Sequence, residues 1–349
     1  MKKQKQKKIR GALWIGVGLM LAIVGVIGGI AYNRLYSPNV RVNENGYLFI
    51  PTGSDFEELV KQLVQQKVIA DEATFRWTAR QMKYDTSIKP GRYRLVAGMT
   101  NRSLVAMLRS GKQAPVKVVF NNVRTTKDLA EKVETQLELT ASSLLNLLSD
   151  RDYLKEFGLT PENALVLFIP NTYEFYWNTS ADKFIRRMKF EYDRFWSENR
   201  KKKAATAGLS PVQVSILAAI VQQESNQESE KPVIAGVYLN RLRKGWKLEA
   251  DPTLVFASGD FNIRRVLNEH KAIDSPYNTY LYGGLPPGPI CLPSPKSIDA
   301  VLGYARHNYM YFCAREDFSG YHNFAATYAQ HLTNARKFQQ AMNRRGIRS

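Results

Sequence analysis

Residues 210–224 read SPVQVSILAAIVQQE, and this stretch decides the fold of the larger part of the chain. It begins with a complete helix start, with Ser210 at the N-cap, Pro211 at the first helical position and Gln213 at the third. The residues that follow are nearly all apolar on one side, which predicts a helix packed against a hydrophobic core. Together with short apolar strands elsewhere, this helix predicts a mixed α+β fold.

Glu224 ends this helix and shares the apolar stripe of Leu217 and Val221, because residues three, four and seven positions apart share a helix face. A carboxylate there lies at the edge of the core or lines a cleft, and loss of hydration then raises its pKa. A Glu that is protonated near neutral pH can act as a general acid. The residues alone leave open that Glu224 simply points outward at a fraying helix end.

A second helix is expected from Glu230 to Arg243, begun by Ser229 and closed by Gly245. Loops rich in Asn, Tyr, Thr, Pro and Gly follow, and such loops build rigid polar surfaces rather than cores. Their Tyr and Asn side chains offer a stacking face and paired hydrogen bonds to sugar rings and amides. These loops are LEADPT at 248–253, SPYNTY at 275–280, GGLPPGPI at 283–290 and GYHNF at 320–324.

Residues 115–349 are expected to form this larger domain, opening with a strand at 116–120 and a helix at 126–138. Lys201, Lys202 and Lys203 predict an exposed loop just before the core helix. Among further carboxylates, Glu228 follows a helix that is ending, and Glu249 flanks a turn together with Asp251.

Residues 40–112 predict a smaller unit of strands and helices. A strand at 47–50 precedes a capping box that runs from Ser54 to Glu57 and opens a helix. A helix at 72–82, a strand at 90–95 and a helix at 101–109 that ends at Gly111 complete it. A β-helix-helix-β unit of this size is typical of a binding module, although a structural spacer stays open.

Residues 11–32 contain no charged side chain. At 1.5 Å per residue they cover about 33 Å, enough for the roughly 30 Å hydrocarbon core of a membrane. A cleaved signal peptide is the rival interpretation, but its apolar region is shorter and ends in small residues. Basic residues crowd positions 1–10, so this tail is expected in the cytoplasm and everything after the single span outside it.

The composition excludes several classes of protein. The chain has 349 residues, a net charge of +19, two Cys and four His. Two Cys cannot form a disulfide framework, and the sequence has no CxxC or HExxH motif for zinc. The positive charge predicts a polyanion partner or simply a solvated basic face. No helix-turn-helix, RNP or zinc-finger motif supports nucleic acid, and a span of membrane makes it improbable as a partner.

Several of these motifs resemble those of the YceG-like, or MltG-type, endolytic murein transglycosylases. The motifs are IVQQES at 220–225, VYLNRL at 237–242, EADPT at 249–253, SPYNTY at 275–280, GLPPGPI at 284–290 and GYHNF at 320–324. The anchor, the small first unit, which resembles a LysM-like subdomain, and the catalytic domain follow in the order of that family. One departure is Asn171, where an Asp is usual.

The resemblance implies a lytic transglycosylase, a carbon–oxygen lyase. It would cleave peptidoglycan between N-acetylmuramic acid and N-acetylglucosamine and leave a 1,6-anhydromuramoyl end, which limits strand elongation. Glu224 matches the catalytic Glu of the family. One carboxyl group suffices, because the C6 hydroxyl of the sugar takes the place of the water that ordinary glycosidases activate with a second carboxylate. No metal and no cofactor are expected.

The resemblance also implies the partners of the protein, its location and its glycan contacts. The expected partners are peptidoglycan glycan strands and, as candidates, peptidoglycan synthases of the penicillin-binding type. The expected location is the cytoplasmic (inner) membrane, crossed once, with the catalytic domain on the periplasmic side. Asn278 and Tyr280 are the preferred glycan contacts. Asp251 either orients substrate or braces loops, and His322 either touches substrate or is a structural His.

Two rival functions remain. The first is a membrane-anchored, non-catalytic peptidoglycan-binding scaffold of the wall-synthesis machinery, which would tolerate loss of Glu224. The second is a serine acyl enzyme, because Ser180 to Lys183 forms an S-x-x-K match. No K-T-G motif follows it, and so short a match arises by chance.

Overall fold

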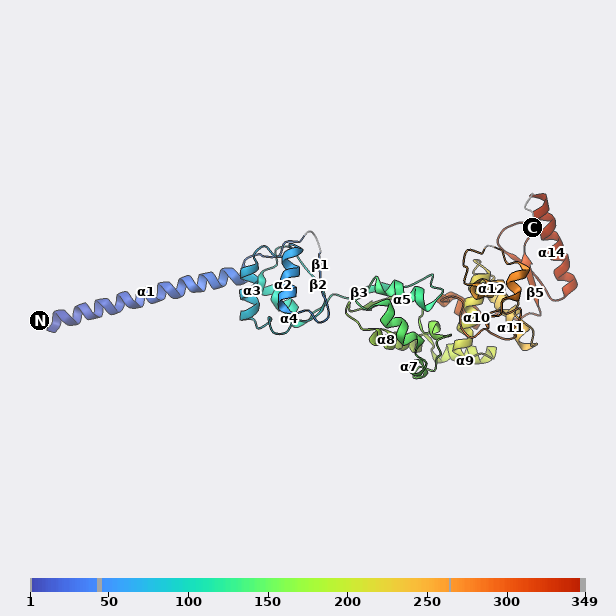
Figure 1. Ribbon diagram of the computed structural model, residues 1–349, viewed down its shortest axis with the longest axis horizontal. Coiled ribbons are helices and arrows are strands. Elements are labelled where there is room, and N and C mark those ends of the chain that lie inside the picture. Colours follow the sequence, from blue (N-terminus) through green and yellow to red (C-terminus); the bar gives the residue numbers. More distant parts are fainter. Residues whose placement is uncertain (1, 43–45, 264, 346–349) are drawn as a thin grey trace. The chain divides into compact units, whose positions relative to one another are not determined.

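The computed structural model describes residues 2–42, 46–263 and 265–345, with side chains from Gly11 onward. The side chains of the basic tail predicted at 1–10 therefore lie outside the described residues. The chain divides into two compact units, which are described separately (Figure 1). The first comprises Met1–Val116 with Glu174–Asn178, and the second comprises Lys117–Tyr173 with Thr179–Ser349.

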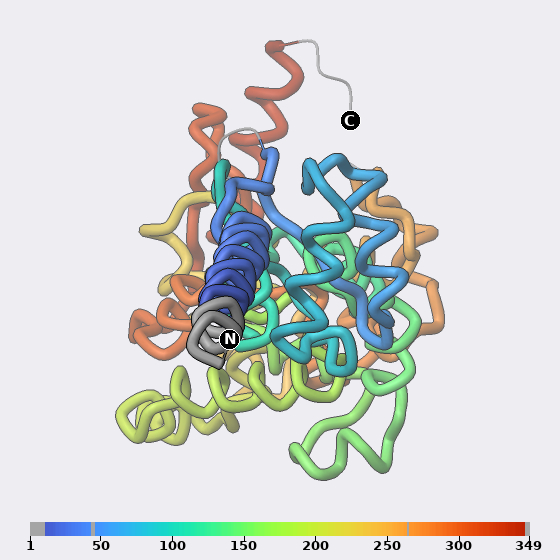
Figure 2. Tube along the Cα trace, turned by 90° about the vertical axis from the view of Figure 1, so that its left-hand side faces the viewer, coloured from blue at the N-terminus to red at the C-terminus, as the bar shows by residue number. Residues whose placement is uncertain are grey.

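The first unit begins with α1 (Lys2–Tyr36), one unbroken helix that Figure 2 shows nearly end-on. Within the described chain, α1 is the one helix that is by itself long and apolar enough to cross a membrane, over Gly11–Tyr36. The apolar segment therefore continues in helical form beyond the predicted end at residue 32. Helices α9 and α10 meet the same criterion as a pair bent by 73°, but α10 is a core helix of the second unit.

After α1, the first unit contains a small sheet and three helices. Strand β1 (Tyr47–Ile50) pairs antiparallel with β2 (Gly91–Arg94), and α2 (Phe56–Gln65) and α3 (Glu72–Gln81) connect them. Helix α4 (Asn101–Ser110) follows and ends at Gly111, whose left-handed φ of 72° favours glycine. The predicted β-helix-helix-β order is thus confirmed, whereas the LysM-like identity of this unit stays a prediction.

The cap of α2 differs from the prediction by one residue. Asp55, not Ser54, is the N-cap, and its side chain accepts a hydrogen bond from the Glu58 backbone N–H at 2.8 Å. Glu58 accepts in return from the Asp55 N–H at 3.1 Å. Both Ser54 and Asp55 are good N-cap residues, and each has a Glu three positions on, so the sequence pattern alone fits either register.

The second unit carries most of the helices and one complete small sheet. Strands β3 (Val116–Val119) and β4 (Thr172–Phe175) pair, as do β5 (Tyr311–Ala314) and β6 (His322–Ala325) in antiparallel register. The helices before the core helix are α5 (Thr126–Glu134), α6 (Ala141–Ser149), α7 (Arg151–Lys155), η1 (Ala164–Leu167), α8 (Ala181–Phe195) and α9 (Glu198–Ala207). The remaining helices are α10 (Pro211–Glu224), α11 (Lys231–Arg243), α12 (Asp251–Ser258), η2 (Asn268–Ala272), α13 (Pro295–Leu302) and α14 (Tyr328–Arg344).

Helix α10 is the centre of the second hydrophobic core, and it packs against α9, α11, α12 and α13. Its predicted start is confirmed, since the Ser210 N–H donates to Gln213 Oε1 at 2.8 Å and the Gln213 N–H donates to Ser210 Oγ at 3.2 Å. Every residue from Val214 to Val221 is buried, so the helix is enclosed on all sides rather than along one stripe. This enclosure fixes the position of its C-terminal residue.

Three local predictions in the second unit are wrong. Lys201 to Lys203 lie inside α9, which Ser197 caps and Gly208 ends with a φ of 78°. Ser229 does not cap α11, whose N-cap is Glu230. The helix predicted at 126–138 ends at Glu134. Caps decide the boundaries of α9, whereas Glu230 makes no side-chain cap hydrogen bond at the start of α11.

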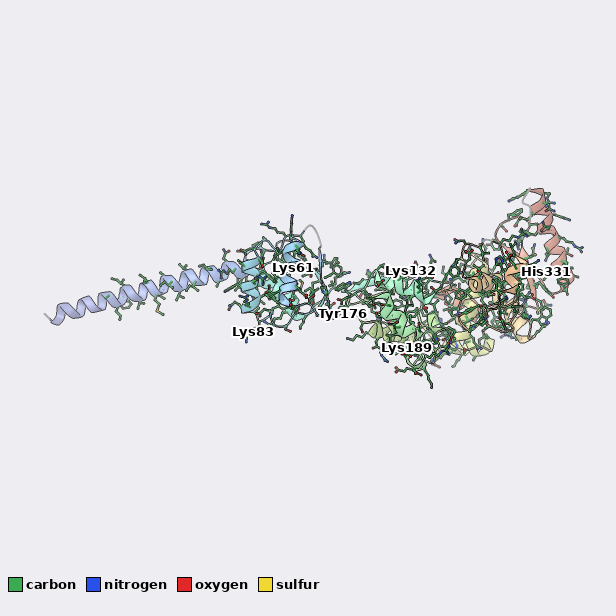
Figure 3. All side chains as sticks on the ribbon, in the orientation of Figure 1. Lys61, Lys83, Lys132, Tyr176, Lys189 and His331 are labelled. Carbon is green, nitrogen blue, oxygen red and sulfur yellow. The ribbon has the colours of Figure 1, made fainter. Side chains whose placement is uncertain are left out.

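Basic side chains are exposed to solvent on both units. Lys61 and Lys83 are exposed in the first unit, and Lys132 and Lys189 are partly exposed in the second (Figure 3). Many basic side chains of α8 pair along the helix with acidic ones, such as Lys189 with Asp193 at 2.6 Å. A solvated basic face, the simpler of the two sequence interpretations, describes these residues well.

Candidate active site

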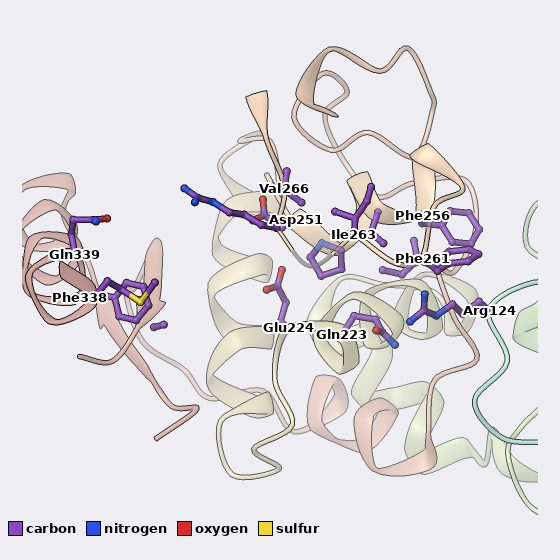
Figure 4. Close-up of a pocket in the computed structure, with 16 residues that line it drawn as sticks. Arg124, Gln223, Glu224, Asp251, Phe256, Phe261, Ile263, Val266, Phe338 and Gln339 are labelled. Carbon is purple, nitrogen blue, oxygen red and sulfur yellow. The ribbon is translucent and has the colours of Figure 1, made fainter. Parts of the chain in front are cut away.

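Glu224 lies at the C-terminal end of α10 and faces a cavity of about 870 Å³ in the second unit. A volume of this size is in the range of ligand-binding pockets. Figure 4 shows Glu224 and Asp251 pointing into this cavity, with Gln223 beside the helix end. The remaining lining residues are Arg124, Pro252, Val255, Phe256, Phe261, Ile263, Arg265, Val266, Ile290, Ala314, Phe338, Gln339 and Met342.

Tyr238 of α11 holds the Glu224 carboxyl group. Its hydroxyl donates a hydrogen bond to Glu224 Oε1. The Tyr238 ring is almost fully buried and meets Phe312 of β5 edge-on, with ring centroids 5.9 Å apart. The carboxyl group is therefore oriented by a side chain that is itself fixed by packing, which is what a preorganised catalytic group requires.

Burial raises the pKa of Glu224 to about 7. The negative charge of Asp251 also raises this pKa, whereas the Tyr238 hydrogen bond and the positive charge of Arg241 lower it. Glu224 is consequently divided between its protonated and ionised forms near neutral pH. A group in that condition can both donate and accept a proton.

Asp251 lines the cavity, and it is paired with Tyr280, which is not among the lining residues. Asp251 is the first residue of α12, where the sequence predicts a turn. The Tyr280 hydroxyl donates to Asp251 Oδ1 at 2.5 Å, and the ammonium group of Lys271 lies 5.1 Å from the centre of the Tyr280 ring. The carboxylate of Asp251 raises the pKa of Tyr280, although burial contributes more, so the phenol keeps its proton.

Asn278 is not placed to contact a ligand, contrary to the expectation from sequence. Its side chain is fully buried and donates to the carbonyls of Lys271 at 3.0 Å and Ile273 at 2.8 Å. Its Oδ1 accepts from the Tyr280 N–H at 2.9 Å. Asn278 thus braces the loop that presents Tyr280, because a buried amide uses its hydrogen bonds internally.

His322 lies in β6 and pairs with buried Glu230. Its Nδ1 is 2.9 Å from Glu230 Oε2, and its backbone N–H donates to Glu230 Oε1 at 2.8 Å. His322 is not among the cavity residues. Of the two interpretations left open by the sequence, this geometry favours the structural His.

Three arginines at or near the site were missed by sequence reasoning: Arg124 and Arg265 line the cavity, and Arg241 lies near enough to Glu224 to lower its pKa. Arg241 is buried and donates from Nε to the Met310 carbonyl at 2.8 Å and from Nη1 to the Leu248 carbonyl at 2.6 Å. Arg241 thereby ties α11 to the segments that contain Met310 and Leu248. Arg124 lines the cavity from the segment before α5, about a hundred residues before Glu224 in the sequence. Spacing gives no signal for so distant a neighbour.

The other carboxylates considered from sequence have structural partners. Glu228 pairs with Lys231 at 2.7 Å, and Glu249 lies 3.5 Å from Arg241. Neither lines the cavity. Asn171 is exposed, accepts from the Thr172 N–H at 2.8 Å and is also outside the cavity lining. In the described part of the chain, no three His, Cys, Asp or Glu side chains cluster as a metal site would require.

The site is therefore of the acid–base class, with one protonatable carboxyl group at the end of an enclosed core helix in an α+β unit. A sequence profile of the YceG-like family matches residues 48–337, and the chain belongs to that family.

Relatives of known name agree with this family. The chain is 26% identical over 310 residues to an endolytic murein transglycosylase of Bacillus subtilis, covering 84% of this chain and 85% of the relative. It is 25% identical over 335 residues to an endolytic murein transglycosylase of Streptococcus pneumoniae, covering 85% of this chain but 60% of that longer protein. The crystal structure of a YceG-like protein from Listeria monocytogenes covers 84% of this chain with a TM-score of 0.54 and 26% identity.

Proposed function

We propose that this protein is a membrane-anchored endolytic peptidoglycan transglycosylase. It cleaves the bond between N-acetylmuramic acid and N-acetylglucosamine in glycan strands and leaves 1,6-anhydromuramoyl ends. Family membership and the names of the relatives support the reaction class. The observation that carries the proposal is Glu224. Its carboxyl group lines the cavity, and burial raises its pKa to about 7.

In the first step, protonated Glu224 acts as the general acid. Its proton passes to the glycosidic oxygen while the bond between that oxygen and C1 of the muramoyl residue breaks, and the N-acetylglucosamine leaves as an alcohol. Positive charge develops at C1. The carboxylate of Asp251, which lines the same cavity, supplies negative charge that stabilises such a cation.

In the second step, the ionised Glu224 acts as the general base. It takes the proton of the C6 hydroxyl while that oxygen forms a bond to C1, which closes the anhydro ring. The enzyme regains its starting proton, and no water is consumed. The Tyr238 hydrogen bond stabilises the ionised form of Glu224 between the two steps.

Endolytic cleavage requires sugar units to bind on both sides of the broken bond. The cavity extends to both sides of Glu224, with Arg124 and Phe261 on one side and Phe338 and Gln339 on the other (Figure 4). The arrangement of lining residues therefore supports cleavage within a strand rather than removal of a terminal unit.

The proposed setting follows from the apolar part of α1. We take residues 11–32 as the core of a single span of the cytoplasmic membrane, residues 1–10 as a cytoplasmic tail, and the rest as periplasmic. Residues 40–112 are proposed to be a LysM-like wall-binding subdomain and residues 115–349 the catalytic domain. Peptidoglycan synthases are proposed partners, because cleavage of nascent strands would limit their elongation.

The test uses purified glycan strands and mass spectrometry of the products. The protein without its span is expected to release fragments with anhydromuramoyl ends, and the Glu224→Gln variant is expected to release almost none. Reducing ends in place of anhydro ends would mean hydrolysis and would overturn the lyase mechanism. Tight binding of strands without any cleavage by the wild type would instead favour the non-catalytic scaffold.

A further inference from the structure

The proposed chemistry uses the carboxyl groups of the cavity and leaves Arg124 without a role. Arg124 lines the same cavity as Glu224, and Figure 4 shows its guanidinium group turned toward the side where Gln223 and Glu224 lie. A guanidinium group has five N–H donors in a planar fork. In the described part of the chain, none of these donors has a hydrogen-bond acceptor, and no carboxylate lies within ion-pair distance.

The backbone of Arg124 is nevertheless held firmly. The N–H groups of Arg124 and Thr125 both donate to Asp128 Oδ2 at 3.0 Å, within the capping box of α5. The preceding residue, Val123, is buried, and its carbonyl accepts from the Leu292 N–H at 2.8 Å. The side chain therefore starts from a fixed point at the cavity edge.

The side chain is also held, by an aromatic ring rather than by an anion. The guanidinium carbon lies 4.6 Å from the centre of the Phe261 ring, which lines the same cavity. Stacking of this kind orients the plane of an arginine while leaving its N–H edge available for a ligand.

Arg241 shows what a structural arginine looks like in this unit. It is buried, donates to two backbone carbonyls and lies 3.5 Å from the Glu249 carboxylate. Its charge lowers the pKa of Glu224, whereas Arg124 is not among the groups that shift it. Among the described residues, the Arg124 head group therefore makes no hydrogen bond or ion pair that braces the fold, and it does not set the protonation of Glu224.

We infer that Arg124 forms a subsite for a carboxylate of the substrate. This inference rests on the proposed function, because it concerns the ligand of the same cavity. Arginine binds carboxylates through two parallel hydrogen bonds, which neutral sugar hydroxyls cannot match. A muramoyl residue supplies a carboxylate in one of two ways: from its lactyl group when no peptide is attached, or from the peptide stem when one is.

The test measures binding in the Glu224→Gln background, where cleavage does not interfere. Calorimetry would use three ligands: a disaccharide with a free lactyl carboxylate, the same disaccharide carrying a peptide stem with free carboxylates, and that compound with its carboxylates converted to amides. Adding Arg124→Gln is expected to weaken binding of one carboxylate ligand about tenfold and leave binding of the amide unchanged. The affected ligand identifies the source of the carboxylate.

Two further variants keep the result interpretable. Lys127→Gln removes the same charge from an exposed position three residues away and should leave all three affinities unchanged. Arg124→Lys keeps the charge without the planar fork and should lose about threefold. Equal affinities of the Arg124 variants and their parent for both carboxylate ligands, or an equal loss on the amide, would overturn the inference.

This outcome is separate from that of the proposed function. Wild-type turnover of glycan strands is measured in parallel, and absence of anhydro product would refute the transglycosylase. The calorimetry would still decide whether Arg124 selects a carboxylate. In turnover, Arg124→Gln should raise KM and leave both kcat and its pH dependence unchanged, since Arg124 does not set the pKa of Glu224.

Discussion

The two units of the chain bury different kinds of polar side chain. Among the described residues, the first unit buries only neutral ones, namely Asn39, Thr78 and Asn101. Two of them bond directly, since Asn39 Nδ2 donates to Asn101 Oδ1 at 2.7 Å. The second unit also buries the charged side chains of Glu230, Lys231 and Arg241. Charge is costly to bury, so the second unit is where polar groups are held for chemistry or for shaping a site.

The comparison predicts the largest effect for Glu224→Gln. The variant keeps the side-chain shape and can still accept the Tyr238 hydrogen bond, but it has no transferable proton. Loss of general acid–base catalysis typically costs 10²–10⁴-fold in rate, roughly 3–5 kcal/mol. Product formation should fall by at least that factor, while Glu228→Gln and Glu249→Gln keep most of the activity. Equal losses in all three variants would contradict a special role for Glu224.

The same variant tests the cost of burying the carboxylate. Burial raises the pKa of Glu224 from 4.5 to about 7, so the folded protein binds its proton more tightly than the unfolded chain. Wild-type stability should therefore decrease as the pH rises from about 4.5 to 7, by about 3 kcal/mol at most. Glu224→Gln should lack this decrease and melt higher than wild type at pH 8, as calorimetry at several pH values would show.

The second prediction concerns the tight loops of the second unit. A Cβ atom at Gly288 would lie 1.7 Å from the backbone oxygen of Glu162, so Gly288→Ala must displace a loop that leads to Ile290 of the cavity. We expect a loss of about 1–3 kcal/mol in the free energy of unfolding, measured by denaturant titration. Gly283→Ala is the matched control, because nothing lies within 4 Å of its added Cβ. Equal effects of both would mean that the close approach does not matter.

The third prediction concerns the first unit and the end of its long helix. The Arg34 carbonyl accepts hydrogen bonds from Asn101 Nδ2 at 3.0 Å and Thr78 Oγ1 at 3.3 Å. A protein that begins at residue 37 loses this acceptor, so one N–H of the Asn101 amide is left without a partner, whereas a protein that begins at residue 31 keeps the acceptor. Thr78 Oγ1 retains its shorter bond to the Thr74 carbonyl at 2.9 Å. We expect the shorter protein to be less stable by about 1–2 kcal/mol in thermal unfolding. Identical stabilities would show that the hydrogen bonds to the Arg34 carbonyl do not stabilise the first unit.

The smallest expected effects are shifts in the pH dependence of kcat/KM, and they have opposite signs for two neighbours of Glu224. Asp251→Asn removes a negative charge that raises the pKa of Glu224, while its Oδ1 can still accept from Tyr280. Tyr238→Phe removes a hydrogen bond that lowers this pKa. The pH above which kcat/KM falls should therefore decrease in Asp251→Asn and increase in Tyr238→Phe, each by about one unit or less. Shifts of the same sign would contradict the assigned interactions.

The sequence predicted those features that depend on neighbouring residues. The capping box at Ser210, the helix that it starts and the stripe that ends at Glu224 are all local patterns, so they could be found by spacing alone. The prediction at Ser54 failed because the neighbouring Asp55 is an equally good N-cap. The prediction of a loop at Lys201–Lys203 failed because it rested on charge and ignored the caps Ser197 and Gly208. The helix boundary in such a case depends on tertiary packing, which residue spacing does not reveal.

The partners of Glu224 could be predicted only in part. Tyr238 belongs to a motif noted in the sequence. Which side of α11 contacts Glu224 depends on the tertiary packing of α11 against α10, which the motif does not give. The residue type of Asn278 suits a sugar contact, yet the same hydrogen-bonding capacity equally suits an amide that braces a buried loop. A loop rich in polar residues does not reveal which of them point inward. Arg124 was missed because only the tertiary fold brings it to the cavity.

The central claim is that Glu224 alone supplies the proton of the reaction, from a partly buried carboxyl group at the edge of the cavity. Its ionisation can be followed by NMR titration of protein labelled with ¹³C at the Glu side-chain carboxyl carbons, with Glu224→Gln assigning the signal. We predict a midpoint near pH 7 that coincides with the pH above which kcat/KM falls, because burial raises the pKa to about that value. A midpoint near the ordinary 4.5, with cleavage still active at pH 7, would contradict Glu224 as the proton donor.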